Sequence, residues 1–145
     1  MRAVALTGLE LHHHAVRMKP HAAEAALQFY RDVLGLTPDP QARDIPGVPL
    51  FWMDTANGTQ IHLFGVDGVS QYARQPDRDP FVEHVAFGVP DIADARAELD
   101  RLQVSYWKVG RDESQQIFLY DDSRNMIELH QIGTCRCNRA ARTEA

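Results

Sequence analysis

Apolar and polar positions alternate with period two in two short segments of the chain that resemble each other. Residues 13–18 read HHAVRM and residues 84–89 read HVAFGV, so each segment begins with histidine and has alanine two positions later. Side chains of a strand point alternately to opposite faces, so each segment predicts a strand. One face carries His13, Ala15 and Arg17, matched by His84, Ala86 and Gly88, and the other carries His14, Val16 and Met18, matched by Val85, Phe87 and Val89. We expect the second face to pack under a helix, whereas the small residues of the first leave space beside its histidine.

A helical spacing of apolar residues follows each predicted strand. Over residues 21–36 the expected apolar stripe is Ala22, Ala26, Phe29, Val33 and Leu36, and Gly35 is the expected end of the helix. Over residues 91–104 the expected N-cap is Asp91, and the stripe is Ile92, Ala95, Leu99 and Leu102. The two helices therefore have similar lengths and similar places in the two halves.

Further strands complete each half. Residues 47–66 contain two apolar runs separated by DTANGT, whose Asn-Gly pair is a hairpin signal, and residues 114–132 repeat the scheme around DDSRN. Aligning the final strands, QIHLF at 60–64 and MIELH at 126–130, places His62 opposite Glu128. An internal repeat of this size is a stronger indication of architecture than any single motif.

The repeat predicts one compact α+β domain built from two similar units. We expect the first unit over residues 8–66 and the second over residues 82–132. The segment 67–81, which is rich in glycine, proline and charge, is the expected linker. Residues 133–145 are expected to form a flexible tail.

Four potential metal ligands occupy equivalent places in the two halves. His13 pairs with His84 in the first strands, and His62 pairs with Glu128 in the last strands. If the halves pack about a pseudo-twofold axis, these side chains can converge, and three imidazoles with one carboxylate suit Zn, Ni, Co, Mn or Fe. The competing interpretation is that the four residues bind no metal. A single histidine in a strand is usually a surface or core residue, and a glutamate in a strand usually faces solvent.

The neighbouring histidines receive a different interpretation. The alternation places His14 on the packing face, and His12 shares that face, so neither is expected to bind a metal. His12 would replace His13 as a ligand if the register of the strand slipped by one residue.

Composition and charge exclude some classes of function. The chain has 145 residues, 44% hydrophobic and 24% charged, with a net charge of −5 and no basic stripe, so we expect no nucleic-acid partner. No apolar run approaches the roughly 20 residues that span a bilayer. Cys135 and Cys137 are too close in sequence to cross-link a core, which favours a reducing cytoplasm. They could bind a metal as a Cys-x-Cys pair, but a frayed tail is the favoured interpretation.

These motifs resemble the vicinal oxygen chelate superfamily, which includes glyoxalase I, methylmalonyl-CoA epimerase, extradiol dioxygenases and fosfomycin- and bleomycin-resistance proteins. The similarity covers residues 8–132, through HHAVRM, ALQFYRDVLGL, IHLF, EHVAFGV and IELH. It implies paired βαβββ modules that form curved mixed sheets around a central metal cavity, usually in a homodimer. The site is then either within one chain or shared between two. The family's ligand positions fall on His13, His62, His84 and Glu128. The last turn departs from the family's usual Asp-Pro-x-Gly-Asn, because it carries Asp122, Ser123, Arg124 and Asn125.

The resemblance implies a divalent-metal-dependent lyase or isomerase of the glyoxalase or epimerase type. A substrate with two neighbouring oxygens would chelate the metal, which would stabilise an enediolate, with Glu128 as both ligand and base. An extradiol ring-cleaving dioxygenase is the first alternative, although His62 fills a position that those enzymes leave unligated. A thiol transferase of the fosfomycin-resistance type is another. Trp107 and Lys108 fit it, but Asp112, Phe118 and Ala15 replace its hydroxyl residues. A non-enzymatic drug-binding protein would lack the four ligands.

A few further residues are candidates for the substrate cavity. Trp52, Trp107 and Phe118 are strand aromatics that line the cavity or, as is more common, belong to the core. Arg17 shares the predicted face of His13 and is a candidate contact for an anionic substrate.

Overall fold

The computed structural model describes residues 6–138, and within them each half of the chain forms a βαβββ unit. The first unit contains β1 (Glu10–Met18), α1 (Ala23–Gln28), β2 (Thr37–Pro38), β3 (Leu50–Asp54) and β4 (Gln60–Gly65). The second contains β5 (His84–Val89), α2 (Ile92–Arg101), β6 (Trp107–Val109), β7 (Gln116–Tyr120) and β8 (Met126–Gln131). Two 3₁₀ turns, Pro20–Ala22 and Asp112–Ser114, and a wide helical turn, Phe29–Val33, complete the elements.

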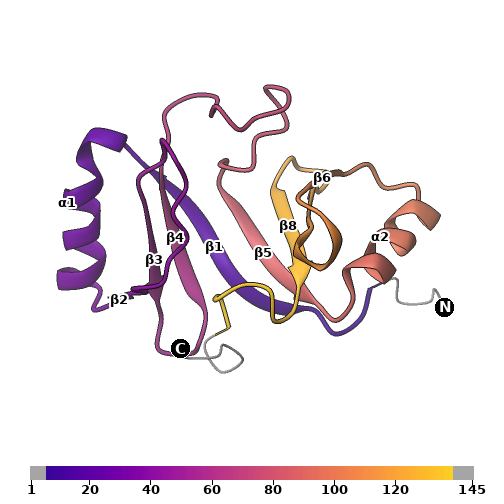
Figure 1. The fold of residues 1–145 in the computed structure, drawn as a ribbon, viewed down its shortest axis with the longest axis horizontal. Coiled ribbons are helices and arrows are strands. Elements are labelled where there is room, and N and C mark those ends of the chain that lie inside the picture. Colours follow the sequence, from indigo (N-terminus) through magenta and orange to yellow (C-terminus); the bar gives the residue numbers. More distant parts are fainter. Residues whose placement is uncertain (1–5, 139–145) are drawn as a thin grey trace.

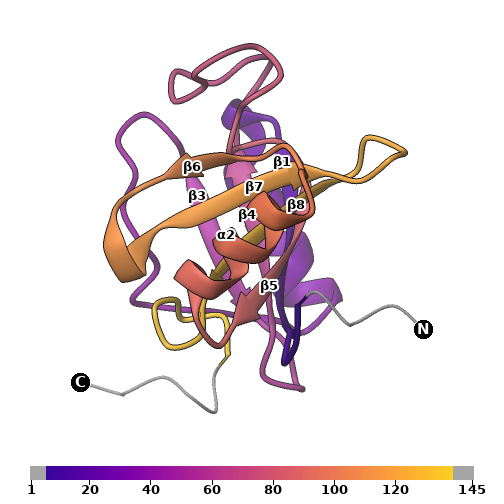
Figure 2. The ribbon, with the colours of Figure 1, turned by 90° about the vertical axis from the view of Figure 1, so that its right-hand side faces the viewer.

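The strands form one mixed eight-stranded sheet in the order β2-β3-β4-β1-β5-β8-β7-β6. Within each unit the first and last strands run parallel, and β1 and β5 join the units antiparallel. In Figure 1 these two strands lie at the centre, with α1 at one side of the sheet and α2 at the other. Figure 2 shows how strongly the sheet of the second unit is turned relative to that of the first. The predicted glyoxalase-like α+β fold is therefore confirmed.

The register repeats between the units. Ala15 of β1 is the partner of His62 of β4, and Ala86 of β5 is the partner of Glu128 of β8. Across the central pair, Ala15 lies opposite His84, and Ala86 lies opposite His13. Each histidine therefore faces a small, fully buried alanine on the neighbouring strand, which leaves room for its ring.

The register of β1 shifts between Leu11 and His13, so His12 is an extra residue in the pairing with β5. A bulge of this kind interrupts the alternation of faces. His12 and His13 are consequently both buried, whereas His14 is exposed. The expectation that His12 shares a face with His14 was wrong for this reason. His14 alternates with His13 as predicted, but it is exposed instead of packed under a helix.

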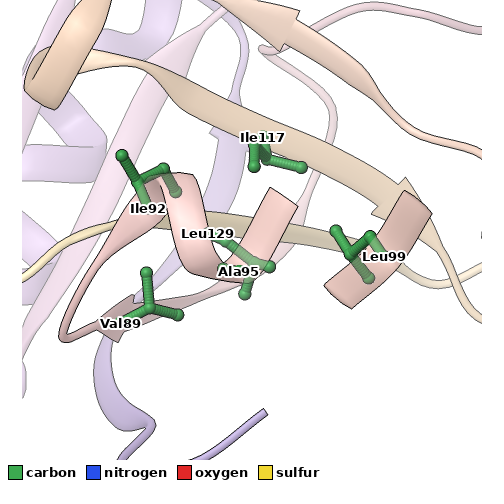
Figure 3. Packing of buried hydrophobic residues seen from close by; sticks show 6 residues of the cluster. All are labelled: Val89, Ile92, Ala95, Leu99, Ile117 and Leu129. Atoms are coloured by element: carbon green, nitrogen blue, oxygen red, sulfur yellow. The ribbon is translucent and has the colours of Figure 1, made fainter. Parts of the chain in front are cut away.

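The helix α2 follows its sequence pattern closely. The side chain of Asp91 accepts a hydrogen bond of 3.0 Å from the backbone N–H of Asp94, as a helix N-cap does. Three residues of its predicted stripe are buried against the sheet, and the fourth, Leu102, lies just after the helix and is 44% exposed. Figure 3 shows the resulting core, which consists of Val89, Ile92, Ala95, Leu99, Ile117 and Leu129.

The first helix departs from its predicted stripe. The α-helical turn ends at Gln28, and the wider turn Phe29–Val33 rotates the residues that follow it. Phe29 is 52% exposed and Val33 is 66% exposed, while Leu27 and Tyr30 pack against the sheet. The predicted end is present, because Gly35 has a φ of 71°, a conformation that favours glycine.

Residues 67–81 connect the units through turns rather than strands or helices. Asp79, which is buried, holds this segment by accepting hydrogen bonds from the backbone and hydroxyl of Ser70. Among residues 6–138, no helix combines the length and the apolar character needed to cross a membrane.

Candidate metal centre

Three of the four predicted ligands converge at the junction of the two units. Nε2 of His13 lies 3.3 Å from Nε2 of His84, and Oε1 of Glu128 lies 3.3 Å from His84 Nε2 and 3.8 Å from His13 Nε2. All three side chains are buried. They come from β1, β5 and β8, so one chain supplies all three donors.

The protonation of His84 is set by its surroundings. Its Nδ1 lies 2.6 Å from the carbonyl oxygen of Val82 and must donate a proton to it. In the corresponding tautomer of the neutral ring, the lone pair is on Nε2, the nitrogen that faces Glu128. A backbone carbonyl in this position is the usual outer partner of a metal-binding histidine, because it fixes the tautomer and the ring orientation.

The donors fit a divalent cation on electrostatic grounds. Glu128 is buried, and within residues 6–138 its ion-pair partners are imidazoles, with no lysine or arginine among them. Positive charge stabilises a buried carboxylate. His130, whose pKa is raised to about 10, supplies such charge at Oε2, while Oε1 faces His13 and His84 and is open to a further positive charge. A metal ion bound to two imidazoles and one carboxylate supplies that charge.

The shifted pKa values of these groups favour the protonation states that metal ligands need. Burial lowers the pKa of His13 to about 3, so this imidazole is neutral at physiological pH. Burial lowers the pKa of His62 well below its usual value as well. Burial alone would raise the pKa of Glu128, but His13, His130 and His84 hold it well below its usual value. Metal binding requires neutral imidazoles and an ionised carboxylate.

His62 lies beside this group but is oriented differently. Its ring stacks on that of His13 at 3.8 Å between centroids and on that of Trp52 at 4.5 Å. Its Nε2–H donates to Oε1 of Gln60 at 2.9 Å, and the same nitrogen lies 3.8 Å from the sulfur of Cys137. The structure therefore brings His62 to the site without directing its nitrogen at His84 and Glu128.

A second group of donors lies next to the first and was not predicted. Nδ1 of His12, Nε2 of His130 and Sγ of Cys135 lie within hydrogen-bonding distance of one another. The signal for His130 was present in the sequence, since it lies two residues after Glu128 on the same face of β8. No periodicity of the sequence marks the two cysteines.

The segment after β8 packs on the sheet instead of fraying. Figure 1 shows it crossing from the second unit to the edge of the first. Cys137 is 1% exposed, and its sulfur lies 3.1 Å from Nδ1 of His13. Arg136 forms two hydrogen bonds, of 2.8 and 3.1 Å, with the buried carboxylate of Asp39. The favoured interpretation of the two cysteines as part of a frayed tail was therefore wrong, while residues 139–145 lie outside the described residues.

The charges in this segment are strongly coupled. Hydrogen bonds from the Cys137 thiol and then from His12 and His130 overcome burial and lower the pKa of Cys135 to about 2. Burial would lower the pKa of His130, but the hydrogen bonds with Cys135 and Glu128 raise it to about 10. Burial, together with the neighbouring Cys135, raises the pKa of Cys137 well above its usual value.

A cavity of about 870 Å³ opens beside the donors. Trp52 and Phe118 line it, as do His13, His62, His84 and Glu128. Trp107 is buried behind Phe118 and lies outside this lining, because the ring of Phe118 stacks between it and His84. Arg17 also lies outside the lining, since it donates to the carbonyl of Phe81 at 2.8 Å and pairs with Asp79 at 3.5 Å. These two contacts hold the connecting segment rather than the cavity.

Solved structures share this fold across most of the chain. A hypothetical protein from Bacillus halodurans is 20% identical, with a TM-score of 0.65, and the match covers 86% of this chain and 95% of that one. Methylmalonyl-CoA epimerase from Mycobacterium tuberculosis is 22% identical, with a TM-score of 0.63 and coverage of 90% and 91%. A 2,3-dioxygenase from Pseudomonas sp. KL28 is 19% identical, with a TM-score of 0.58, and the match covers 84% of this chain and 40% of that one.

Comparison of the sequence with known proteins and protein families identifies the family of this chain. No curated protein matches the chain significantly. A profile of the Glyoxalase/Bleomycin resistance protein/Dioxygenase superfamily matches residues 11–129, which include all four predicted ligands. The chain therefore belongs to this superfamily.

Proposed function

We propose that this protein is a divalent-metal-dependent lyase or isomerase that acts on a small substrate with two neighbouring oxygen atoms. The observation that carries the proposal is the convergence of His13, His84 and Glu128 on one buried point beside the cavity. Their lone pairs and negative charge suit one cation, which would be Zn, Ni, Co, Mn or Fe. A drug-binding protein without catalysis has no need of such a buried group of converging donors.

These three residues are the proposed ligands, and His62 is a fourth donor only if its Nε2 leaves Gln60. When bound there, a divalent ion supplies Lewis acidity to two substrate oxygens. Glu128 must stay ionised to act as a ligand, and its lowered pKa supports that role. A general base is most effective with a pKa near the working pH, so the same shift makes Glu128 a weak general base.

The cavity supports a small-molecule substrate. Its volume of about 870 Å³ lies within the range of ligand pockets, roughly 300 to 1,000 Å³. The walls near the donors include Trp52, Phe64 and Phe118, which exclude water from the reacting atoms. Arg43 and Arg74 are exposed at the lining, and we propose that they attract an anionic group of the substrate.

A ring-cleaving dioxygenase is the second candidate. Two histidines and one carboxylate with open positions form the ligand set of many non-haem iron oxygenases. The hydrogen bond between His62 and Gln60 favours this candidate, because it leaves the group with three donors instead of four.

The test measures metal-dependent turnover of the full chain without a tag. Metal-stripped protein is reloaded with each of Zn²⁺, Ni²⁺, Co²⁺, Mn²⁺ and Fe²⁺. It is then assayed, in the presence and absence of oxygen, against hemithioacetals of 2-oxoaldehydes, 2-substituted acyl thioesters and catechols. We expect turnover that needs metal but no oxygen and that is lost in His84→Ala. Turnover of catechols that requires oxygen would establish the second candidate in place of the first. Turnover that is unaffected by His84→Ala would overturn both.

A further inference from the structure

We propose that this protein has a second metal site, formed by His12, His130 and Cys135, which takes zinc. This site is separate from the group of His13, His84 and Glu128, and it does not depend on the reaction proposed above.

The three donor atoms meet at one point. Nδ1 of His12 lies 2.7 Å from Nε2 of His130, and the sulfur of Cys135 lies 3.3 Å from the first nitrogen and 3.2 Å from the second. Both histidines are buried, and Cys135 is partly buried. Ordinary packing does not require three side chains from different parts of the chain to direct their donor atoms at one another.

The other ring nitrogen of each histidine is held by a carboxylate. Nε2 of His12 lies 2.9 Å from Oε1 of Glu10, and Nδ1 of His130 lies 2.7 Å from Oε2 of Glu128. Each carboxylate accepts a proton from its imidazole, so the facing nitrogens become lone-pair donors once a metal displaces the protons that they share with Cys135. A carboxylate behind each histidine is the arrangement that orients imidazole ligands in known metal sites.

The backbone is shaped to allow this arrangement. The bulge in β1 turns His12 toward the same side as His13. Gly88 of β5 leaves the space that the ring fills, since a Cβ atom there would lie 2.7 Å from Nε2 of His12. Arg136 and Asp39 hold the segment that carries Cys135 against the sheet.

The donor types indicate zinc. One thiolate and two imidazoles form a borderline-soft set, which favours zinc over the hard cations Mg²⁺ and Ca²⁺. Three protein ligands leave one position of a tetrahedral zinc for water or substrate. His130 and Cys135 line the same cavity as the first site, and Glu128 touches both groups, with Oε1 toward His84 and Oε2 toward His130.

A competing interpretation treats Cys135, His130 and Glu128 as a nucleophilic cysteine with its base and orienting acid. Their order and distances fit that role. It leaves unexplained why His12 directs Nδ1 at both Cys135 and His130, and why Glu10 orients His12. The metal site accounts for all of these contacts.

The test uses the full chain without a tag, reduced and stripped of metal, titrated with Co²⁺ as a spectroscopic substitute for Zn²⁺. We expect two ions per chain and a near-ultraviolet thiolate-to-cobalt charge-transfer band. Cys135→Ser should bind one ion and lose the band, whereas Cys137→Ser, which tests the other thiol, should keep the band. Thr134→Ala, at an exposed residue beside Cys135, is the matched control and should keep both ions and the band. His12→Gln, which keeps the thiol, should also lose the band, and circular dichroism melts establish that each variant is folded. On the zinc protein, X-ray absorption should show one sulfur at about 2.3 Å and nitrogen at about 2.0–2.1 Å.

A band that survives Cys135→Ser, or that disappears in Cys137→Ser, would overturn the proposal. So would a wild-type protein without the band, and alkylation of Cys135 that zinc does not slow would then favour the nucleophilic cysteine. His84→Ala separates the two sites, because it should remove the first ion and leave the band intact. Failure of the proposed reaction therefore leaves this site testable by itself.

Discussion

His130 donates its Nδ1–H to Oε2 of Glu128 across 2.7 Å, which leaves Oε1 of the same carboxylate to face His84 at 3.3 Å. His130 thus orients the carboxylate of Glu128, and the free oxygen of that carboxylate faces His84. The hydrogen bond on the second oxygen fixes the position of this carboxylate before a metal binds. The side chain therefore loses less conformational entropy on metal binding. The following prediction depends on this geometry.

Glu128→Gln should remove metal from the first site. The amide keeps the shape of the side chain but loses the negative charge, so nothing balances the charge of an ion beside His13 and His84. Outer-shell changes alone weaken metal binding by about 10- to 100-fold, and we expect a loss of at least about 100-fold for a direct ligand, measured by calorimetric titration. Activity should fall in parallel.

Glu83→Gln is the matched control for this change, because Glu83 is exposed and lies next to His84 in sequence. It should bind metal as the wild type does. Unchanged affinity in Glu128→Gln would contradict the assignment of Glu128 as a ligand.

His62→Ala should leave one ion at the first site and weaken its binding less than about tenfold, since Nε2 of His62 contacts Gln60 rather than the other donors. His13→Ala should abolish binding at the same site. Elemental analysis of the two variants after dialysis distinguishes three ligands from four. Equal losses of metal in both would show that His62 coordinates the ion when it is bound.

Much of this arrangement was predictable because it depends on register. Alternation along the first strands identified His13 and His84 with their small neighbours, and the repeat placed His62 and Glu128 at equivalent positions. The structure has that equivalence, with Ala15 beside His62 and Ala86 beside Glu128. What the repeat could not supply is the orientation of His62, which depends on a hydrogen bond with its own neighbour on the same face.

The second group of donors was missed for two physical reasons. A bulge turned His12 toward the cavity side, and a bulge breaks the periodicity from which faces are inferred. His130 was detectable from its spacing to Glu128. Cys135 and Cys137 reach the sheet through a segment without periodic pattern, held by the long-range pair of Arg136 and Asp39. Contacts between residues so far apart in sequence leave no local signal.

The metal-free protein should show an alkylation rate at Cys135 that is nearly independent of pH between about 6 and 9. Because the pKa of Cys135 is lowered to about 2, the thiolate fraction is already complete at pH 6 and cannot rise further. An ordinary cysteine with a pKa of about 8.5 reacts faster as pH rises through this range. Mass spectrometry after short iodoacetamide pulses measures the rate for each cysteine. A rate that climbs tenfold per pH unit at Cys135 would show an ordinary thiol.

Arg136→Ala should loosen the segment that carries both cysteines. It removes two hydrogen bonds and one positive charge from the buried carboxylate of Asp39, which keeps the hydrogen bonds of Gln41 and Gln60. The expected cost is about 1–3 kcal/mol in the free energy of unfolding. Cys137, which is 1% exposed, should then react with a disulfide reagent at least tenfold faster under native conditions. Arg111→Ala, at an exposed arginine, is the matched control and should change neither quantity.

The pH dependence of this pair has a definite sign. Burial would raise the pKa of Asp39, but Arg136, Gln41 and Gln60 lower it below its usual value of 3.8. A carboxyl whose pKa is lower in the folded state stabilises the fold above the unfolded pKa, and this stabilisation is lost as pH falls through the folded value. The difference in stability between wild type and Arg136→Ala should therefore be constant from about pH 7 down to about pH 5 and should shrink below about pH 4. Urea unfolding at a series of pH values measures it, and a difference that grows on acidification would mean that Asp39 is not the group anchored by Arg136.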